Sequence, residues 1–367
     1  MTQVPVTRVL LLTTSFPRHA ADPAGSFVAG QAAALSAQNL RVRVLAPHAE
    51  WAPPGIEVVS YGGRAPDHGW PEALESSPGR TMFQAVDATR RLMRAACRVA
   101  LPEEVLVAHW LAPCGLAALR VSACNGVVAW SHGGDLALLE RLPVGRTLAR
   151  HLDAGAATLA FVSDDLRHRF QRLLGRPRRT DLVVAPMGVS PPEPDPATMR
   201  RLRTLAGGRP IVATVGRQVP IKGLDVLERA LRGLDVAWLA AGEGPSVPPV
   251  AHALGVLDPR ARDALLAVAD VFVQPSRVLN GRTEGAPVAV LEALASGVPV
   301  VATRTGGLSE VASGARLVPP EDPTALAAAI SAAVRDGRGQ RDERFLWETL
   351  GVEHARLVVR SARRRRP

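Results

Sequence analysis

Residues 284–300 read Glu284-Gly-Ala-Pro-Val-Ala-Val-Leu-Glu292-Ala-Leu-Ala-Ser-Gly297-Val-Pro-Val. The proline of this stretch suits a first helical turn, where its missing N–H costs nothing, and Gly297 followed by Pro299 suits a helix end. The apolar run 298–302 that comes next is typical of a buried parallel strand. The stretch therefore predicts one helix-and-strand unit of an α/β sheet.

The same alternation of short apolar runs and helical stretches continues in both directions along the chain. Before residue 186 we expect strands at 8–13, 41–46, 105–108, 126–130, 158–162 and 181–185. After residue 210 we expect strands at 211–215, 236–241, 271–273, 298–302 and 316–318, with helices near 222–232, 260–268, 287–296 and 323–335. Buried strands that alternate with helices indicate parallel sheets covered on both faces.

The chain has 367 residues, which suits two domains. We expect an N-terminal Rossmann-like domain at 1–188, a proline-rich linker at 189–209 and a C-terminal Rossmann-like domain at 210–340. The last stretch, 341–367, is expected to return to the first domain as a helix that ends in an arginine tail. The fold class is α/β, and the arrangement resembles GT-B, with two doubly wound domains facing across a cleft.

The composition is that of a globular protein, with 47% hydrophobic and 21% charged residues. Basic residues outnumber acidic ones by 44 to 34, and Arg360 and the arginines at 363–366 supply half of this surplus. We therefore expect a mildly basic body, no nucleic-acid partner, and peripheral membrane contact through the basic surface and tail as a possible use of the charge. Lys222 is the only lysine in the sequence.

Three cysteines, at 97, 114 and 124, lack the spacing of metal ligands. Reduced structural thiols are expected, which favours a cytoplasmic location, with peripheral contact at the inner membrane face as an open alternative. The first apolar run is too short for a signal segment or a membrane span.

The predicted helix start at 285–288 has the properties of a phosphate site. Free N–H groups and the helix dipole attract anions there, so Gly285, Ala286, Pro287 and Val288 are candidate donor-binding residues. The carboxylates of Glu284 and Glu292 flank this position and can accept hydrogen bonds from sugar hydroxyls. The alternative is a glutamate at the helix start that only favours the helix dipole, with a second glutamate on a solvent face. This spacing is common, so the spacing alone leaves both interpretations open.

The surrounding motifs resemble glycosyltransferase family four. They are the Glu-x7-Glu pair, Gly-Val-Pro-Val-Val-Ala-Thr after it, Gly306-Gly307-Leu-x-Glu310, and Val-Phe-Val-Gln-Pro-Ser at 271–276. The resemblance implies that Glu284 contacts the transferred sugar and that Glu292 binds ribose hydroxyls. It also implies a donor-binding C-terminal domain, an acceptor-binding N-terminal domain and retention of the anomeric configuration.

A second cluster of candidate residues follows the strand 211–215, in Val-Gly216-Arg217-Gln-Val-Pro-Ile-Lys222-Gly. A strand end in an open sheet is where such folds bind ligands, and two cations can clamp a diphosphate. Two ordinary surface charges are the alternative. The resemblance places Gly216, Arg217 and Lys222 at the donor phosphates.

The N-terminal half supplies candidates at three predicted strand ends. Phe16 and Gly25 lie in the first loop, which the resemblance assigns to donor and acceptor contact; the glycine alone fits a simple turn equally well. His109 follows the strand 105–108, and similar proteins place this histidine beside the sugar; a structural role is the alternative for a lone histidine at a strand end. His132 and Asp135 resemble a His-Gly-x-Asp turn and suit an acceptor pocket, although the turn is also explained by its own aspartate.

The sequence contains no Asp-x-Asp and no His/Cys cluster with metal spacing, so no metal and no cofactor is expected. The resulting hypothesis is a retaining, metal-independent glycosyltransferase that moves a sugar from a nucleotide-diphosphate donor to a hydroxyl acceptor. His109, Arg217, Lys222 and Glu284 are its candidate catalytic residues. A nucleotide-sugar epimerase or hydrolase of GT-B fold, and a non-catalytic nucleotide-binding or scaffold protein, remain alternatives.

Overall fold

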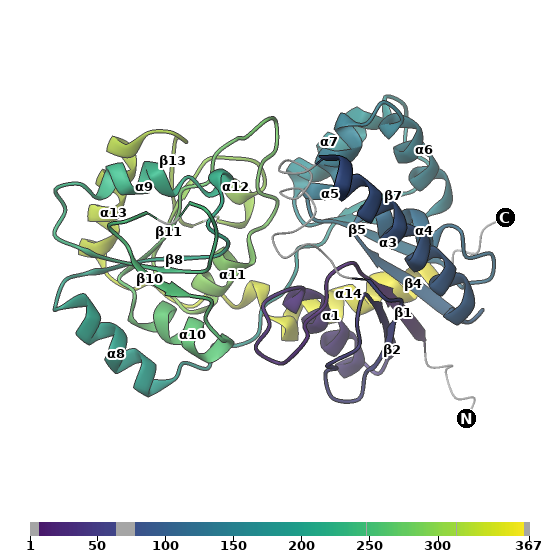
Figure 1. Ribbon diagram of the computed structural model, residues 1–367, viewed down its shortest axis with the longest axis horizontal. Helices are drawn as coiled ribbons and strands as arrows, with labels where there is room; N and C mark the ends of the chain where they lie inside the picture. Colours follow the sequence, from purple (N-terminus) through teal and green to yellow (C-terminus); the bar gives the residue numbers. More distant parts are fainter. Residues whose placement is uncertain (1–6, 64–77, 247, 313, 363–367) are drawn as a thin grey trace. The chain divides into compact units, whose positions relative to one another are not determined.

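The computed structural model describes residues 7–63, 78–246, 248–312 and 314–362. Its contacts divide the chain into two compact units (Figure 1). Unit 1 runs from Met1 to Gly188 and resumes at Trp347, and unit 2 runs from Val189 to Leu346. The arginine tail at 363–366 lies outside the described residues.

Unit 1 is built on a seven-stranded parallel sheet of order β3-β2-β1-β4-β5-β6-β7. Its strands are β1 (Arg8–Leu12), β2 (Arg41–Ala46), β3 (Glu57–Ser60), β4 (Glu104–His109), β5 (Val127–Ser131), β6 (Thr158–Phe161) and β7 (Asp181–Val184). Strands β4, β5 and β6 are buried along their whole length, as a sheet covered on both faces requires. The winding direction reverses between β1 and β4, so this is the switch point of the sheet.

Helices cover both faces of this sheet. One layer contains α1 (Ser26–Ala37) and α14 (Trp347–Ala362), which lie side by side although they come from opposite ends of the chain (Figure 1). The remaining helices pack on one another and on the sheet; they are α3 (Pro78–Val99), α4 (Leu116–Ala118), α5 (Gly134–Arg141), α6 (Gly145–Gly155) and α7 (Asp164–Leu174). A short turn, Leu111–Gly115, leads from β4 into α4.

Unit 2 contains a six-stranded parallel sheet of order β10-β9-β8-β11-β12-β13, whose switch point lies between β8 and β11. Its strands are β8 (Ile211–Val215), β9 (Ala237–Ala241), β10 (His252–Gly255), β11 (Val271–Gln274), β12 (Val300–Thr303) and β13 (Arg316–Val318). Helices α9 (Leu224–Leu231) and α13 (Pro323–Asp336) bury their apolar residues against the strands in one core cluster. The other helices are α8 (Pro196–Ala206), α10 (Pro259–Val268), α11 (Val288–Ala295) and the short α12 (Leu308–Val311), with single turns at Pro220–Lys222 and Glu343–Phe345.

The structure corrects three details of the predicted organisation. The stretch 189–209 is part of unit 2, because its helix α8 packs on α10 and buries Leu202 and Ala206. The last helix begins at Trp347 and not at 341. Strands β3 and β10 were not predicted, because both are short edge strands without the continuous apolar run of a central parallel strand.

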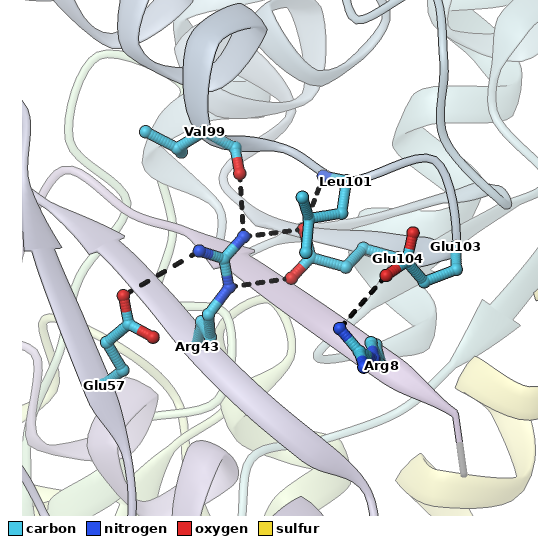
Figure 2. Close-up of polar contacts among 7 residues, drawn as sticks. All are labelled: Arg8, Arg43, Glu57, Val99, Leu101, Glu103 and Glu104. Carbon is cyan, nitrogen blue, oxygen red and sulfur yellow. Dashed lines mark hydrogen bonds and ion pairs between the residues drawn. The ribbon is translucent and has the colours of Figure 1, made fainter.

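An ion-pair network joins the amino ends of the strands in unit 1 (Figure 2). Arg43 donates to both carboxylate oxygens of the buried Glu104, at 2.8 and 2.9 Å, and to the carbonyl of Val99 at 2.7 Å. The hydrogen bond to Glu104 raises the pKa of Arg43. Arg8 pairs with Glu103 at 3.0 Å. These charges are paired with one another at the amino edge of the sheet, whereas the candidate residues lie at the opposite, carboxyl edge.

Candidate functional site

The carboxyl ends of β8, β9 and β11 border a depression in unit 2. It is lined by residues 214–218, Lys222, Leu224, Ala241 and 273–275. These strands surround the point at which the sheet order reverses, and ligands of open α/β sheets bind at such switch points. The predicted phosphate residues Gly216, Arg217 and Lys222 therefore share one location.

Lys222 and Glu284 form an ion pair at this location. The Nζ atom of Lys222 lies 3.0 Å from Oε1 of Glu284, and the two side chains are 16% and 17% exposed. Lys222 ends the single turn after β8, whereas Glu284 lies in the loop between β11 and α11. The N–H of Gly307 donates to the Glu284 carbonyl at 3.2 Å, so the predicted Gly306-Gly307 motif holds the glutamate loop in place.

Arg217 extends from a backbone turn that a second loop supports. The amide of Gly216 donates to Ala241 at 3.0 Å, and that of Gln218 donates to Glu243 at 2.8 Å. Gly242 has a φ of 116°, and a Cβ there would lie 2.0 Å from the Gly216 carbonyl oxygen. Only glycine permits this close approach of the two loops. The Arg217 side chain is exposed and lines the depression.

Glu292 lies on α11 and is paired with Arg262 of α10. Arg262 Nη1 donates to Glu292 at 2.6 Å, and its Nε and Nη2 donate to Asp263 at 3.0 and 2.8 Å. Burial raises the pKa of Glu292 to about 7, while the arginine opposes this shift. The candidate ribose ligand is thus held by a guanidinium that the sequence analysis did not identify.

The start of α11 differs slightly from the prediction. Pro287 has an extended ψ of 118° and caps the helix, so the first helical residue is Val288. No side chain caps this helix start. Gly285 and Ala286 precede it directly, so these four residues form one segment beside Glu284. The carbonyl of Pro287 accepts from Val290 at 3.0 Å, which closes the first turn.

Two candidates of the first loop in unit 1 have packing roles in the structure. Gly25 has a φ of 70°, and a Cβ there would meet the Ser15 carbonyl oxygen at 2.3 Å. The glycine thus allows two backbone segments to come into contact, which supports the interpretation of Gly25 as a turn residue. The ring of Phe16 is 1% exposed and lies 6.3 Å from that of Trp51. The predicted acceptor contact through the Phe16 ring is not supported, because the ring belongs to the core.

His109 and His132 contact each other at the carboxyl ends of β4 and β5. The Nδ1 atom of His109 lies 3.1 Å from Nε2 of His132, and the rings stack at 5.2 Å. Phe27 of α1 packs 4.9 Å from the His132 ring. Burial lowers the pKa of His132 to about 3 and that of His109 well below its usual value, so both are neutral at pH 7.

Asp135 positions the His132 turn rather than presenting a free carboxylate. Oδ1 accepts from the His132 amide at 3.1 Å, the Gly133 amide at 3.0 Å and the Ser131 hydroxyl at 3.1 Å. Oδ2 accepts from the Leu111 amide at 2.7 Å. The side chain is buried in the first turn of α5, where it satisfies these donors. The prediction of Asp135 as an acceptor-binding residue is therefore corrected to a role in holding the turn.

A family model described as "Glycosyl transferases group 1" matches residues 205–336. Over 340 residues the chain is 31% identical to a GDP-mannose-dependent alpha-(1-6)-phosphatidylinositol monomannoside mannosyltransferase of Mycobacterium tuberculosis, covering 83% of this chain and 82% of that protein. The Mycolicibacterium smegmatis protein of the same name is 33% identical over 275 residues, covering 65% and 71%. The chain belongs to the group 1 glycosyltransferases, glycosyltransferase family four.

Solved structures show the fold of this glycosyltransferase to be GT-B. Sucrose-phosphate synthase from Thermosynechococcus elongatus superposes with a TM-score of 0.72 at 18% identity, covering 96% of this chain and 98% of that one. Trehalose-6-phosphate synthase OtsA gives 0.74 at 14% identity, covering 98% and 100%. The predicted family, enzyme class and two-domain α/β fold are confirmed.

Two kinds of feature, a membrane-spanning helix and a metal-binding cluster, are absent from the part of the chain that the structure describes. Within 7–63, 78–246, 248–312 and 314–362, no helix has the length and apolar character needed to cross a bilayer. Within the same ranges, no group of three or more histidine, cysteine or acidic side chains is placed to hold a metal ion.

Four residues that contact the candidate side chains were not predicted from the sequence: Gln31, Phe27, His354 and Arg262. Phe27 and Gln31 are one helical turn apart in α1, and Gln31 is a polar residue on a buried helix face. A polar residue on a buried helix face could have been recognised from the sequence, because a buried polar side chain needs a hydrogen-bond partner. His354 and Arg262 carried no comparable signal, because His354 contacts Pro186, 168 residues away in the sequence, and Arg262 contacts Glu292, 30 residues away.

Proposed function

We propose that this group 1 glycosyltransferase is a retaining, metal-independent enzyme that transfers mannose or a related hexose from a nucleoside-diphosphate sugar to a hydroxyl acceptor. The Lys222–Glu284 ion pair carries the proposal. An ammonium can donate three hydrogen bonds, so Lys222 can bind a donor phosphate while it still orients Glu284. The glutamate can then accept hydrogen bonds from the sugar hydroxyls.

The proposed reaction exchanges one bond at the anomeric carbon. The acceptor oxygen bonds to C1 from the face that the leaving group occupies, the C1–phosphate oxygen bond breaks, and the acceptor proton passes to a donor phosphate oxygen. Negative charge on the diphosphate grows during this step. Arg217, Lys222 and the start of α11 would supply the positive groups that stabilise this charge, which is the part a divalent cation plays in other transferases.

The donor and acceptor classes follow from the relatives, whose names give GDP-mannose as donor and a phosphatidylinositol monomannoside as acceptor. We propose GDP-mannose as the first donor to test and a glycosylated lipid headgroup as the acceptor class. Peripheral contact with an anionic membrane would bring the enzyme to such an acceptor, and α3 exposes Arg90, Arg91, Arg94 and Arg98 for it.

The test is a transfer assay on the full chain with GDP-mannose, UDP-glucose and UDP-N-acetylglucosamine. We expect turnover that requires an acceptor and an NMR spectrum in which the product keeps the α configuration of the donor. A β-linked product would overturn retention. Release of free nucleotide at the same rate without acceptor would favour a hydrolase.

A further inference from the structure

Four side chains of unit 1 form one continuous chain of hydrogen bonds, here called the histidine relay. His354 Nε2 lies 3.1 Å from the Pro186 carbonyl, and His354 Nδ1 lies 2.8 Å from Nε2 of Gln31. Oε1 of Gln31 lies 2.9 Å from His109 Nε2, and His109 Nδ1 lies 3.1 Å from His132 Nε2. His354, Gln31 and His109 are at most 1% exposed, so their hydrogen bonds lie in a low-dielectric interior, where they are stronger than in water.

The direction of every hydrogen bond in the relay follows from its first member. A carbonyl oxygen only accepts, so Nε2 of His354 carries the hydrogen and its Nδ1 must accept. Gln31 therefore presents its NH2 group to His354 and its oxygen to His109. His109 must then donate through Nε2 and accept through Nδ1, which requires His132 to donate through Nε2.

The relay needs His354 and His109 to be neutral, because each accepts through Nδ1 and an imidazolium has no acceptor nitrogen. His132 donates to the relay in either charge state, and it must be neutral for its Nδ1 to accept. Burial is the main cause that lowers the pKa of each ring, to about 4 for His354, to about 3 for His132 and well below the usual value for His109. One atom is left at the end of the relay. His132 Nδ1 carries a lone pair and has no hydrogen-bond partner in the part of the chain that the structure describes.

We propose that the histidine relay fixes His132 in the Nε2–H tautomer, so that Nδ1 accepts a hydrogen bond from a substrate hydroxyl, and that Gln31 and His354 are positioning residues for the transfer reaction. This inference rests on the proposed function for the identity of the hydroxyl. The surroundings of His132 fit it: Phe27 and Trp110 flank the ring at 4.9 and 5.3 Å, and Asp135 holds its backbone amide. His132 is half-buried, in contrast to the other three members.

The relay explains why residue 31 is a glutamine. A carboxylate at this place could accept from His109 but could not donate to His354 Nδ1. Both nitrogens of His354 would then face acceptors, so Gln31→Glu should convert His354 to an imidazolium. With an aliphatic residue at this position, nothing would fix the direction of the hydrogen bond between His109 and His132, and both tautomers of His132 would become populated.

The direct test is a long-range ¹H–¹⁵N correlation spectrum of the imidazole nitrogens, recorded at pH 7 on the full ¹⁵N-labelled chain. We expect His109, His132 and His354 in the Nε2–H form. The exposed His151 is the internal control for an imidazole whose two tautomers are averaged. His132 in the Nδ1–H form would overturn the proposal. This measurement needs no substrate and no variant, so it decides the tautomer even if a relay variant does not fold.

A pair of variants tests the consequence for catalysis. Gln31→Leu should populate the Nδ1–H form of His132 and lower kcat about tenfold, the scale of one neutral hydrogen bond, with donor binding unchanged. Gln38→Leu alters an exposed glutamine just beyond the same helix and should behave like the wild type. Wild-type kcat together with an unchanged tautomer in Gln31→Leu would remove Gln31 from its role. A wild-type chain with the expected tautomers but no transferase activity would instead reject the proposed function and leave the relay in place.

Discussion

Nζ of Lys222 lies 3.0 Å from Oε1 of Glu284, and this contact joins two loops that follow different strands of the same sheet. Both side chains are mostly buried, so the pair is desolvated enough for each charge to orient the other. In the proposed reaction Lys222 contacts the departing diphosphate and Glu284 the sugar. The ion pair thus connects the two groups between which the bond breaks.

Replacing Lys222 should affect the transition state more than the ground state, because charge on the phosphate grows as the sugar departs. We expect Lys222→Ala to lower kcat by about 10²- to 10³-fold with a smaller change in donor affinity. Lys222→Arg should restore little of the lost kcat, since a planar guanidinium does not fit the place of a compact ammonium. Steady-state kinetics and calorimetric titration measure the two effects. Arg335→Ala, an exposed charge in the last turn of α13, is the control; near wild-type turnover of Lys222→Ala would remove the lysine from the site.

Transferase activity should survive saturating EDTA. Arg217 and Lys222 are two cations that line the depression, and they would neutralise the diphosphate in place of a divalent ion. The measurement is the initial transfer rate after dialysis against EDTA, with and without added Mg²⁺ or Mn²⁺. Loss of activity that either ion restores would contradict the metal-independent mechanism.

Gly242→Ala should disrupt the support of Arg217. A Cβ at this position would lie 2.0 Å from the Gly216 carbonyl oxygen, so the loop after β8 must shift. Gly233 is a matched control, because its φ of 84° is also positive but an added Cβ meets nothing within 4 Å. We expect Gly233→Ala to cost about 1 kcal/mol and Gly242→Ala about 1 to 3 kcal/mol more. Urea unfolding gives both values, and equal losses in the two variants would show that the close approach is unimportant.

The contribution of His354 to the free energy of unfolding should fall as pH is lowered from 6.5 towards 4. The pKa of His354 drops from 6.5 to about 4 in the folded chain, chiefly through burial. The unfolded chain therefore binds more protons in this window, and stability present above pH 6.5 is lost on acidification. His354 alone accounts for roughly 3 kcal/mol of this loss.

A variant pair isolates the contribution of His354 to this pH dependence. His354→Gln keeps an acceptor and a donor but cannot titrate, so its unfolding free energy should vary less with pH than that of the wild type. His151→Gln changes an exposed histidine and should retain the wild-type slope. Chemical unfolding at several pH values between 4 and 7 measures both. Identical slopes in the two variants would show that His354 is not protonated on unfolding.

Removing the arginine tail should weaken binding to anionic vesicles without changing donor affinity. The cut belongs after Ala362, because Ser361 is buried and its hydroxyl lies 2.9 Å from that of Thr158. Deleting residues 363–367 removes four arginines and leaves α14 complete. Vesicle sedimentation with phosphatidylglycerol compared with phosphatidylcholine provides the measurement. Unchanged binding to the anionic vesicles would assign the membrane contact to another surface.

The sequence by itself determined the fold class, and its motifs identified the candidate donor-site residues of unit 2. Most central strands were predictable, because parallel strands buried on both faces are continuous apolar runs. The candidates Lys222, Arg217, Glu284 and Glu292 could be proposed from the sequence because they occupy fixed offsets from strand ends and a helix start. The position of a residue relative to a strand end or a helix start depends on its neighbours in the sequence, so a sequence motif can predict it.

Only the tertiary structure decided which partners these side chains have. Nothing local in the sequence pairs Lys222 with Glu284 or Glu292 with Arg262. The histidine relay joins α1, β4, the turn after β5 and α14, whose order in space depends on the winding of the sheet and on the return of the last helix. Hydrogen bonds act over about 3 Å, so their partners are set by how distant segments pack and not by spacing along the chain.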